Sequence, residues 1–314
     1  MNRHHFLKTV STALLGTLVS SSESGSLFAQ EAPIRLEPIE FPELPSPDFF
    51  RVSHSPIQWT RAAPGLEFSR VPVVRDGELV DIIAALRIDP ERNTLRVFHG
   101  YDPRRTTALT IEGWQERTGA IAMVNGGMYM AEPVYMPVAL VKTQGRPLGP
   151  ARNRAARGMI GANPDLRKID LIDFTYEYPA PSLIESYPEL VTHWPILLDR
   201  NGQIRVEKSL WQANRTVAAK SMDGRFLFLT TEGGFFTLFN FGRFLKESND
   251  RQDRGFQVHT AMNLDGGYEA NMVLRTSTHE YTTYGEFETY GPGRDATVRN
   301  MKIPIPGVIG VHPI

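Results

Sequence analysis

The chain has 314 residues, of which 41% are hydrophobic, with 34 Lys and Arg against 35 Asp and Glu and no cysteine. This is enough apolar material for the core of one large domain or two small ones. A net charge of −1 argues against nucleic acid as a partner and against a polybasic membrane anchor. The lack of cysteine excludes disulfides, cysteine-ligated zinc and cysteine nucleophiles.

Residues 1–30 have the pattern of a secretory signal peptide. Arg3 and Lys8 carry positive charge, Val10–Val19 is mildly apolar, and Ser26–Ala29 contains small residues near a plausible cleavage point. The apolar run is too short to span a bilayer, so we expect no stable membrane anchor. An exported chain that has no cysteine is expected to be a periplasmic or secreted bacterial protein. The alternative is that residues 1–30 form a disordered tail of a cytosolic protein.

Residues 31–65 contain recurrent prolines, which favour an extended strap or linker over regular structure. We expect one domain over residues 66–314, starting as an antiparallel meander. Its first hairpin joins Phe68–Val74 to Leu79–Ile88, and Thr94–His99 follows as the next strand.

The middle of the chain predicts one helix and many short strands. Thr107–Thr118 has apolar residues at helical spacing, and the strand Ala120–Val124 follows it. The later predicted strands and hairpins occupy residues 137–142, 159–162, 169–174, 194–206 and 215–231, and residues 179–188 read as an irregular surface loop.

Toward the C-terminus, Glu232-Gly233-Gly234 precedes an amphipathic helix, which we expect to begin just after the glycines. A strand then leads to Asp265, and Met301–Val311 reads as a proline-bearing edge strand. These elements predict an α+β fold with a mixed, largely antiparallel β-sheet core and a few helices.

The segment Thr260–Leu274 is the strongest candidate for a site. An apolar run leads to Asp265, followed by Gly266-Gly267 and then Glu269. A strand end can fix an acid, and glycines allow a ligand or another backbone to come close. The alternative is an ordinary Asp-Gly turn. Asn125-Gly126-Gly127 ends another apolar run in the same way.

These short motifs, in this order, resemble those of the phosphodiester glycosidases, the family of the mannose-6-phosphate uncovering enzyme. The resemblance extends from about Leu66 to Pro313 and rests on the sequences Asn125-Gly126-Gly127-Met128-Tyr129, Pro137-Val138-Ala139-Leu140, Asn214-Arg215-Thr216 and Asn263-Leu264-Asp265-Gly266-Gly267.

The resemblance implies an exported hydrolase that cleaves a sugar-1-phosphodiester or a related envelope or exopolysaccharide linkage. Glycosidic cleavage uses a pair of carboxylates, and we expect Asp265 as one, acting as base or nucleophile, with Glu232 or Glu269 as the other. Arg215 would hold the phosphodiester through two parallel hydrogen bonds. The other predicted substrate-binding residues are Asn125, Gly126, Gly127, Thr216, Gly233, Gly266 and Gly267.

The chain also departs from the family pattern. Tyr268-Glu269-Ala270-Asn271 stands where family members commonly have glycine and serines, and Trp194-Pro195 where many have Gly-Pro. The first departure keeps open a catalytically inactive glycan-binding or envelope-assembly protein on the same scaffold.

The histidines do not pair at metal-ligand spacing, and we expect His193 and His259 to be structural. We therefore predict no metal and no cofactor, with an oxygen-ligated Ca²⁺ or Mg²⁺ near Asp265 as the alternative. The expected partner is a carbohydrate or sugar phosphate, and the sequence does not set an oligomeric state.

Overall fold

The computed structural model describes residues 52–104, 106–249, 255–289, 297–298 and 302–314. The segment predicted as a signal peptide and residues 31–51 of the predicted strap lie outside these ranges. Within them, no helix is long and apolar enough to cross a membrane.

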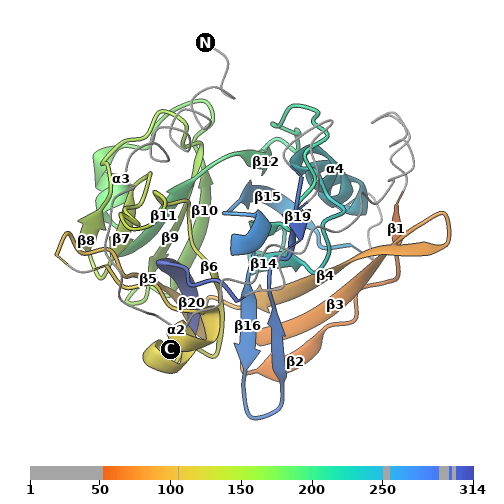
Figure 1. Cartoon of the computed structure of the whole chain (residues 1–314), viewed down its shortest axis with the longest axis horizontal. Coiled ribbons are helices and arrows are strands. Elements are labelled where there is room, and N and C mark those ends of the chain that lie inside the picture. The colour runs from red at the N-terminus through yellow and green to blue at the C-terminus, as the bar shows by residue number, and fades with distance from the viewer. Residues whose placement is uncertain (1–51, 105, 250–254, 290–296, 299–301) are drawn as a thin grey trace, which may run out of the picture.

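Three antiparallel sheets make up most of the described chain (Figure 1). The largest has the order β1-β3-β4-β14-β13-β15-β12, and β2 also pairs with β3. Its strands are β1 (Ser53–His54), β2 (Thr60–Ala63), β3 (Leu66–Arg75), β4 (Glu78–Ile88), β12 (Ile196–Leu198), β13 (Thr216–Ser221), β14 (Phe226–Thr231) and β15 (Val258–Asn263).

The other two sheets have five strands each. The second has the order β10-β9-β11-β7-β8, formed by β7 (Val141–Thr143), β8 (Arg146–Leu148), β9 (Gly158–Asn163), β10 (Lys168–Asp173) and β11 (Glu189–His193). The third has the order β17-β16-β6-β20-β5, formed by β5 (Asn93–His99), β6 (Ala122–Asn125), β16 (Met272–Arg275), β17 (Glu280–Thr283) and β20 (Gly307–Pro313). A separate ribbon pairs β18 (Phe287–Glu288) with β19 (Thr297–Val298).

Helices cover the outer faces of the sheets. α4 (Leu238–Asn249) packs on the first sheet, α3 (Pro181–Glu185) on the second and α2 (Ile111–Thr118) on the third. The main core lies between the three sheets, because its buried side chains come from strands of all of them, including Phe228 and Met262, Ile160 and Val191, and Val124 and Ile309. The predicted α+β fold with a largely antiparallel core and few helices is confirmed.

Local sequence explains where several elements begin and end. The β3–β4 hairpin turns at Asp76 and Gly77, which have φ of 52° and 87°, and two positive φ values suit the twist of a two-residue hairpin. Thr110 Oγ1 accepts the N–H of Gly113 to start α2, and Gly119 ends it at φ 70°.

α4 connects β14 to β15 across β13, so β14 and β15 run in the same direction without pairing. The helix begins at Leu238, four residues beyond the glycine pair, where Thr237 Oγ1 accepts the N–H of Asn240. The prediction that it begins just after the glycines is therefore wrong.

Four other expectations need correction. β1 and β2, within the expected strap, pair with β3. β11 lies in a segment for which we predicted no strand. β20 lies between β6 and β5 and not at an edge of the sheet, because the prolines of residues 302–306 precede the strand and leave its backbone free to pair on both sides. Residues 203–206 contribute only an isolated bridge between Leu198 and Ile204.

Candidate functional site

The candidate site lies where the third sheet meets the first, and a buried asparagine joins them. Asn125 is the last residue of β6 and is 2% exposed. Its Nδ2 donates to the backbone oxygen of Asp265 at 2.8 Å, and its Oδ1 accepts the N–H of Asn271 at 3.2 Å. Both ends of the amide are thus used to position the segment that carries Asp265.

Asp265 follows β15 by two residues, and backbone bonds on both sides hold it. The N–H of Leu264 donates to the oxygen of Thr216 at 2.8 Å, and that of Gly267 to the oxygen of Asn214 at 2.9 Å. The N–H of Gly266 donates to Asp265 Oδ1 at 3.1 Å. The carboxyl group is therefore oriented by rigid backbone rather than by a mobile loop.

The surroundings of Asp265 disfavour its negative charge. Burial raises the pKa of this carboxyl well above its usual value, and the nearby Glu269 and Glu288 raise it further, against a smaller opposing effect of the Gly266 N–H. Three carboxyls thus lie within electrostatic reach of one another. Such an arrangement favours the protonated form of Asp265 up to a higher pH than for an exposed aspartate.

Tyr129 supplies a hydroxyl to this acidic cluster. Its OH donates to Glu269 Oε1 at 3.4 Å, and burial, followed by Glu269 and Asp265, raises the pKa of the phenol. The ring of Tyr135 lies 5.9 Å from that of Tyr129, centroid to centroid. Tyr129 therefore remains a proton-bearing hydrogen-bond donor at neutral pH.

The guanidinium group of Arg215 lies beside this backbone turn. It is 6% exposed, and its Nε and Nη2 donate to the backbone oxygens of Phe236 at 3.2 Å and Trp211 at 2.7 Å. Burial lowers the pKa of Arg215 to about 10, opposed by the charge of Glu288, so the group stays charged at neutral pH. A Cβ added to Gly266 would lie 3.5 Å from Nη1. Because Nε and Nη2 already donate to backbone oxygens, Nη1 is the guanidinium nitrogen that faces the turn at Gly266. We had expected two parallel hydrogen bonds from Arg215 to a ligand.

Glu288 is a third acid near Asp265, and the sequence analysis did not identify it. The segment that carries it is tied down by two more buried asparagines: Asn214 Oδ1 accepts the N–H of Phe287 at 2.9 Å, and Asn271 Oδ1 accepts the N–H of Gly285 at 3.3 Å. No local pattern marks Glu288, because the contacts that bring it to Asp265 span more than twenty residues.

The structure separates Glu232 and Gly233 from this cluster. Glu232 receives Arg70 Nε at 2.7 Å, Arg70 Nη2 at 2.6 Å and the Tyr281 hydroxyl at 2.7 Å. The N–H of Gly233, which we expected to bind phosphate, donates to Asp81 Oδ1 at 2.7 Å. Among the described residues, the carboxylates that act on Asp265 are Glu269 and Glu288 and not Glu232.

Other predicted binding residues support the site from behind. Thr216 is fully buried with its Oγ1 3.4 Å from Thr230 Oγ1, and the N–H of Gly126 donates to the oxygen of Gly307 at 2.9 Å. A Cβ on Gly127 would lie 3.1 Å from His193 Cδ2. The Thr216 side chain and the Gly126 N–H are thus engaged within the protein, and Gly127 packs closely against His193.

Two residues that the sequence analysis discussed are buried. Tyr268 is 5% exposed, so its ring is withdrawn from solvent. His193 has its Nδ1 2.7 Å from the oxygen of Asn263, and burial lowers its pKa to about 4, which keeps the imidazole neutral. Among the described residues, no group of three or more His, Asp or Glu side chains is arranged to hold a metal ion.

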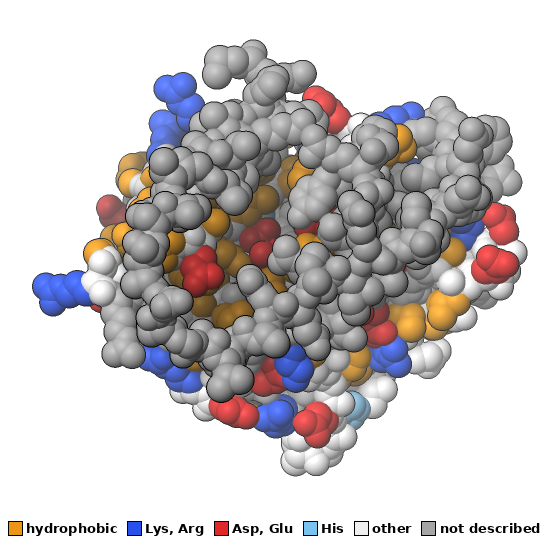
Figure 2. Space-filling model, viewed as in Figure 1, with side chains coloured by type: hydrophobic (Ala, Val, Ile, Leu, Met, Phe, Trp, Pro, Cys, Tyr) orange, Lys and Arg blue, Asp and Glu red, His pale blue; other side chains and the backbone are white. Residues whose placement is uncertain are grey.

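Where described atoms are visible, Figure 2 shows acidic side chains at the middle of the face, among hydrophobic ones. Acids in apolar surroundings are the condition that raises a carboxyl pKa.

Comparisons with known proteins relate this fold to one family. The structure is similar to a hypothetical protein from Synechocystis, with a TM-score of 0.58, 14% identity and coverage of 82% of this chain, which spans 63% of that protein. It is also similar to the zebrafish N-acetylglucosamine-1-phosphodiester alpha-N-acetylglucosaminidase catalytic domain auto-inhibited by its pro-peptide, with a TM-score of 0.54, 15% identity and coverage of 83% and 88% of the two chains. No curated protein sequence matches.

The family model for phosphodiester glycosidase matches residues 118–312, which is more than half of the chain and includes Asn125, Arg215 and Asp265. The resemblance inferred from the short motifs is confirmed, and the chain belongs to the phosphodiester glycosidase family.

Proposed function

We propose that the protein is an exported hydrolase that cleaves a sugar-1-phosphodiester or a related envelope or exopolysaccharide linkage at Asp265. The observation that carries this proposal is the raised pKa of the Asp265 carboxyl, which is caused by burial and by the charges of Glu269 and Glu288. The backbone turn that follows Asp265 lies beside the guanidinium group of Arg215. A partly exposed acid with a raised pKa and a second carboxyl nearby suits glycosidic bond cleavage.

The raised pKa supports Asp265 as the proton donor, rather than the base or nucleophile expected from sequence. In this scheme Asp265 transfers its proton to the leaving phosphate oxygen as the bond from that oxygen to the anomeric carbon breaks. Glu269, which accepts the Tyr129 hydroxyl, takes a proton from the water that attacks the same carbon. Glu288 adds the negative charge that keeps the proton on Asp265 before reaction.

Arg215 would bind the phosphodiester through Nη1. Because two carbonyl oxygens hold the guanidinium in place, little side-chain freedom is lost when an anion binds. A phosphodiester carries one negative charge, and one charge-assisted hydrogen bond from Nη1 to a non-bridging oxygen would orient it beside Gly266.

The test is hydrolysis of a panel of sugar-1-phosphodiesters by the purified protein, with release of the sugar and of the phosphate monoester both measured. We expect turnover that Asp265→Asn abolishes and that the matched control Glu232→Gln retains, with unaltered melting temperatures. Turnover that survives Asp265→Asn would overturn the assignment of the site. The same assay in the presence of EDTA tests the alternative of an oxygen-ligated cation. If such a cation takes part in the reaction, chelation should lower turnover.

Saturable glycan binding without turnover, weakened by Asp265→Asn, would instead support the inactive glycan-binding protein. Export is proposed from residues 1–30 and has its own test: mass spectrometry of the secreted or periplasmic protein, which should find an N-terminus close to Ala29. Only full-length protein in the cytosol would contradict it.

A further inference from the structure

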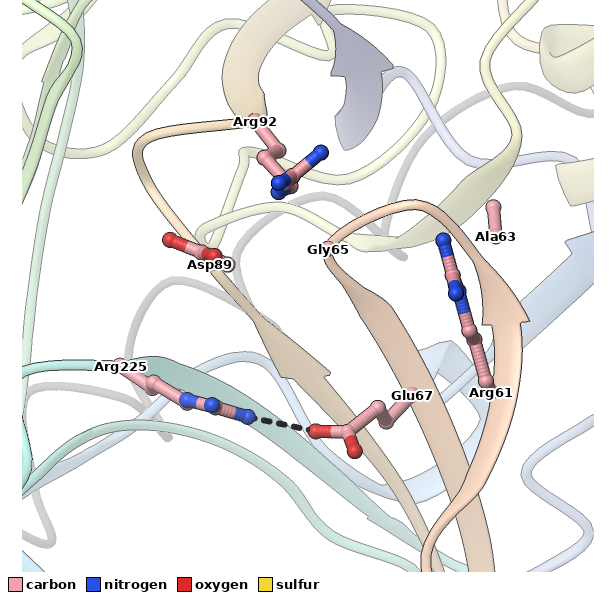
Figure 3. Close-up of a pocket in the computed structure, with 7 residues that line it drawn as sticks. All are labelled: Arg61, Ala63, Gly65, Glu67, Asp89, Arg92 and Arg225. Atoms are coloured by element: carbon pink, nitrogen blue, oxygen red, sulfur yellow. Dashed lines mark hydrogen bonds and ion pairs between the residues drawn. The ribbon is translucent and has the colours of Figure 1, made fainter.

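A second region of the molecule gathers positive charge around a hollow. Arg61, Arg92 and Arg225, together with Glu67 and Asp89, line a pocket of about 240 Å³. We call it the arginine pocket. Figure 3 shows the three arginine side chains arranged around the tight turn at Gly65, each from a different part of the chain.

The arginine pocket lies at the opposite end of the first sheet from Asp265. Arg225 immediately precedes β14, whereas Thr231, which bonds to Arg215, is the last residue of that strand. Six residues of extended chain separate the two ends by roughly 20 Å. A ligand in the arginine pocket would therefore not occupy the candidate catalytic site.

The two acids of the arginine pocket do not cancel its charge. Glu67 already binds two guanidinium groups, Arg87 Nε at 2.7 Å and Arg225 Nη1 at 2.6 Å. Asp89 accepts the N–H of Glu91 at 3.0 Å. In the described part of the chain, the exposed side chains of Arg61 and Arg92 make no hydrogen bond or ion pair. With three arginines against two acids the pocket keeps a net positive charge, and the guanidinium groups of Arg61 and Arg92 remain available to a ligand.

The backbone beneath these arginines is rigid. Gly65 adopts φ +72°, and a Cβ there would lie 2.6 Å from Arg92 Cβ. The N–H of Asp89 donates to the oxygen of Gly65 at 2.8 Å, and Asn93 Nδ2 donates to that of Pro64 at 3.0 Å. The base of the Arg92 side chain is therefore held against the β2–β3 turn, next to Arg61.

We propose that the arginine pocket is an anion-binding site that takes a phosphate group. Two unpaired guanidinium groups match an anion with two charges or more better than a single carboxylate, and their planar donors fit phosphate oxygens. A neighbouring hollow of about 620 Å³ shares Arg92 and is lined by Arg167 and Pro313. It offers room for whatever carries the phosphate, either a glycan or a small phosphorylated compound.

The test is calorimetric titration of the full chain with two probes, inorganic pyrophosphate and a phosphodiester-linked oligomer of N-acetylglucosamine. We expect saturable binding that the double variant Arg61→Gln/Arg92→Gln weakens about tenfold. The matched control is Arg146→Gln on β8, an exposed arginine outside both hollows, which should leave the affinity unchanged. Melting temperatures establish that the variants fold, as expected for exposed side chains.

If the oligomer binds more tightly than pyrophosphate, the ligand is a phosphorylated glycan. If pyrophosphate binds more tightly, the ligand is a small phosphate compound. Either result supports the anion-binding site. Absence of saturable binding at millimolar concentration, or a change below threefold in the double variant, would overturn it. The titrations are made with Asp265→Asn, which removes hydrolysis of the oligomer and should retain the affinity of the arginine pocket, so failure of the proposed function and failure of this site are distinguishable.

Discussion

Two strands of the first sheet lead into an acid followed by two glycines, and the two acids have opposite surroundings. β14 leads directly into Glu232-Gly233-Gly234, and β15 leads through Leu264 into Asp265-Gly266-Gly267. Glu232 receives two hydrogen bonds from Arg70 and one from a phenol. Asp265 receives one backbone N–H and faces two other carboxylates.

The difference shows that a strand-end acid becomes a candidate catalyst only through its neighbours. A carboxylate with a cationic partner is neutralised and serves as a structural link between chain segments. A carboxyl among other carboxyls has a raised pKa, which suits the role of a proton donor. Four predictions test this contrast, from the largest expected effect to the smallest.

The largest effect is expected on turnover. Asp265→Asn should lower kcat by about 10³-fold or more, because the amide cannot donate a carboxylic proton. Glu232→Gln should change kcat by less than about threefold, since Glu232 contacts Arg70 and Tyr281. Steady-state kinetics on the same phosphodiester measures both, and equal losses in the two variants would contradict the contrast.

The second prediction concerns pH and Asp81, which accepts the N–H of Gly233. Burial raises the pKa of Asp81 from 3.8 to about 6, so the folded protein holds a proton that the unfolded chain releases. The stabilisation from this proton is fully present below pH 3.8 and is lost as pH rises through about 6. At 1.36 kcal/mol per pKa unit it amounts to about 3 kcal/mol.

Urea unfolding of the wild type and of Asp81→Asn between pH 4 and pH 7 measures this change. Asparagine does not titrate, so the stability of the wild type relative to the variant should fall with rising pH. Parallel stability curves for the two proteins would contradict a raised pKa at Asp81.

The third prediction compares the glycines that follow the two acids. Gly267 has φ +67°, and a Cβ there would lie 2.6 Å from Glu288 Oε2, whereas at Gly233 a Cβ would lie 3.1 Å from Asp81 Oδ1. Gly267→Ala should lower the free energy of unfolding by about 2 kcal/mol, and Gly233→Ala, which requires no left-handed backbone, by about 1 kcal/mol. Denaturant titration measures both, and the reverse order would be inconsistent with the described turn.

The smallest effect is expected at the Glu232 ion pair. Arg70 has a side chain that is half exposed, so Arg70→Gln should cost less than about 1 kcal/mol of unfolding free energy. A loss above about 2 kcal/mol would mean that Glu232 is left as an uncompensated buried charge. Thermal melts at low and high salt add a check, because an exposed pair weakens as salt rises.

Much of the fold was predictable because its signals are local. The Asp76-Gly77 turn, the helix that ends at Gly119 and the apolar face of α4 each follow from residues within one or two turns of chain. β11 was missed because a proline-bearing loop precedes it and hid a short strand. β20 was placed at an edge because prolines lie just before it, although they fall outside its paired residues.

The candidate site was predictable only in part. Asp265 and Arg215 were found from the motifs and Glu269 from its position after Gly266-Gly267, and the structure places the charge of Glu269 near Asp265. Glu232 was expected with them from its Gly-Gly sequence alone, but Arg70 and Tyr281 engage it. Nothing in the sequence indicated Glu288, nor that Asn214 and Asn271 would hold its segment over Gly267.

By itself, the sequence determined the strand ends, the turns and the family, because hydrophobic period, glycine and short motifs act over a few residues. The tertiary structure alone decided which acid is paired with a cation, which acid keeps a proton, and which arginines converge on a pocket. Those outcomes depend on charges that the fold brings together, 23 residues apart for Asp265 and Glu288 and 162 for Arg70 and Glu232, and a carboxyl pKa is set by the groups within a few ångströms of it.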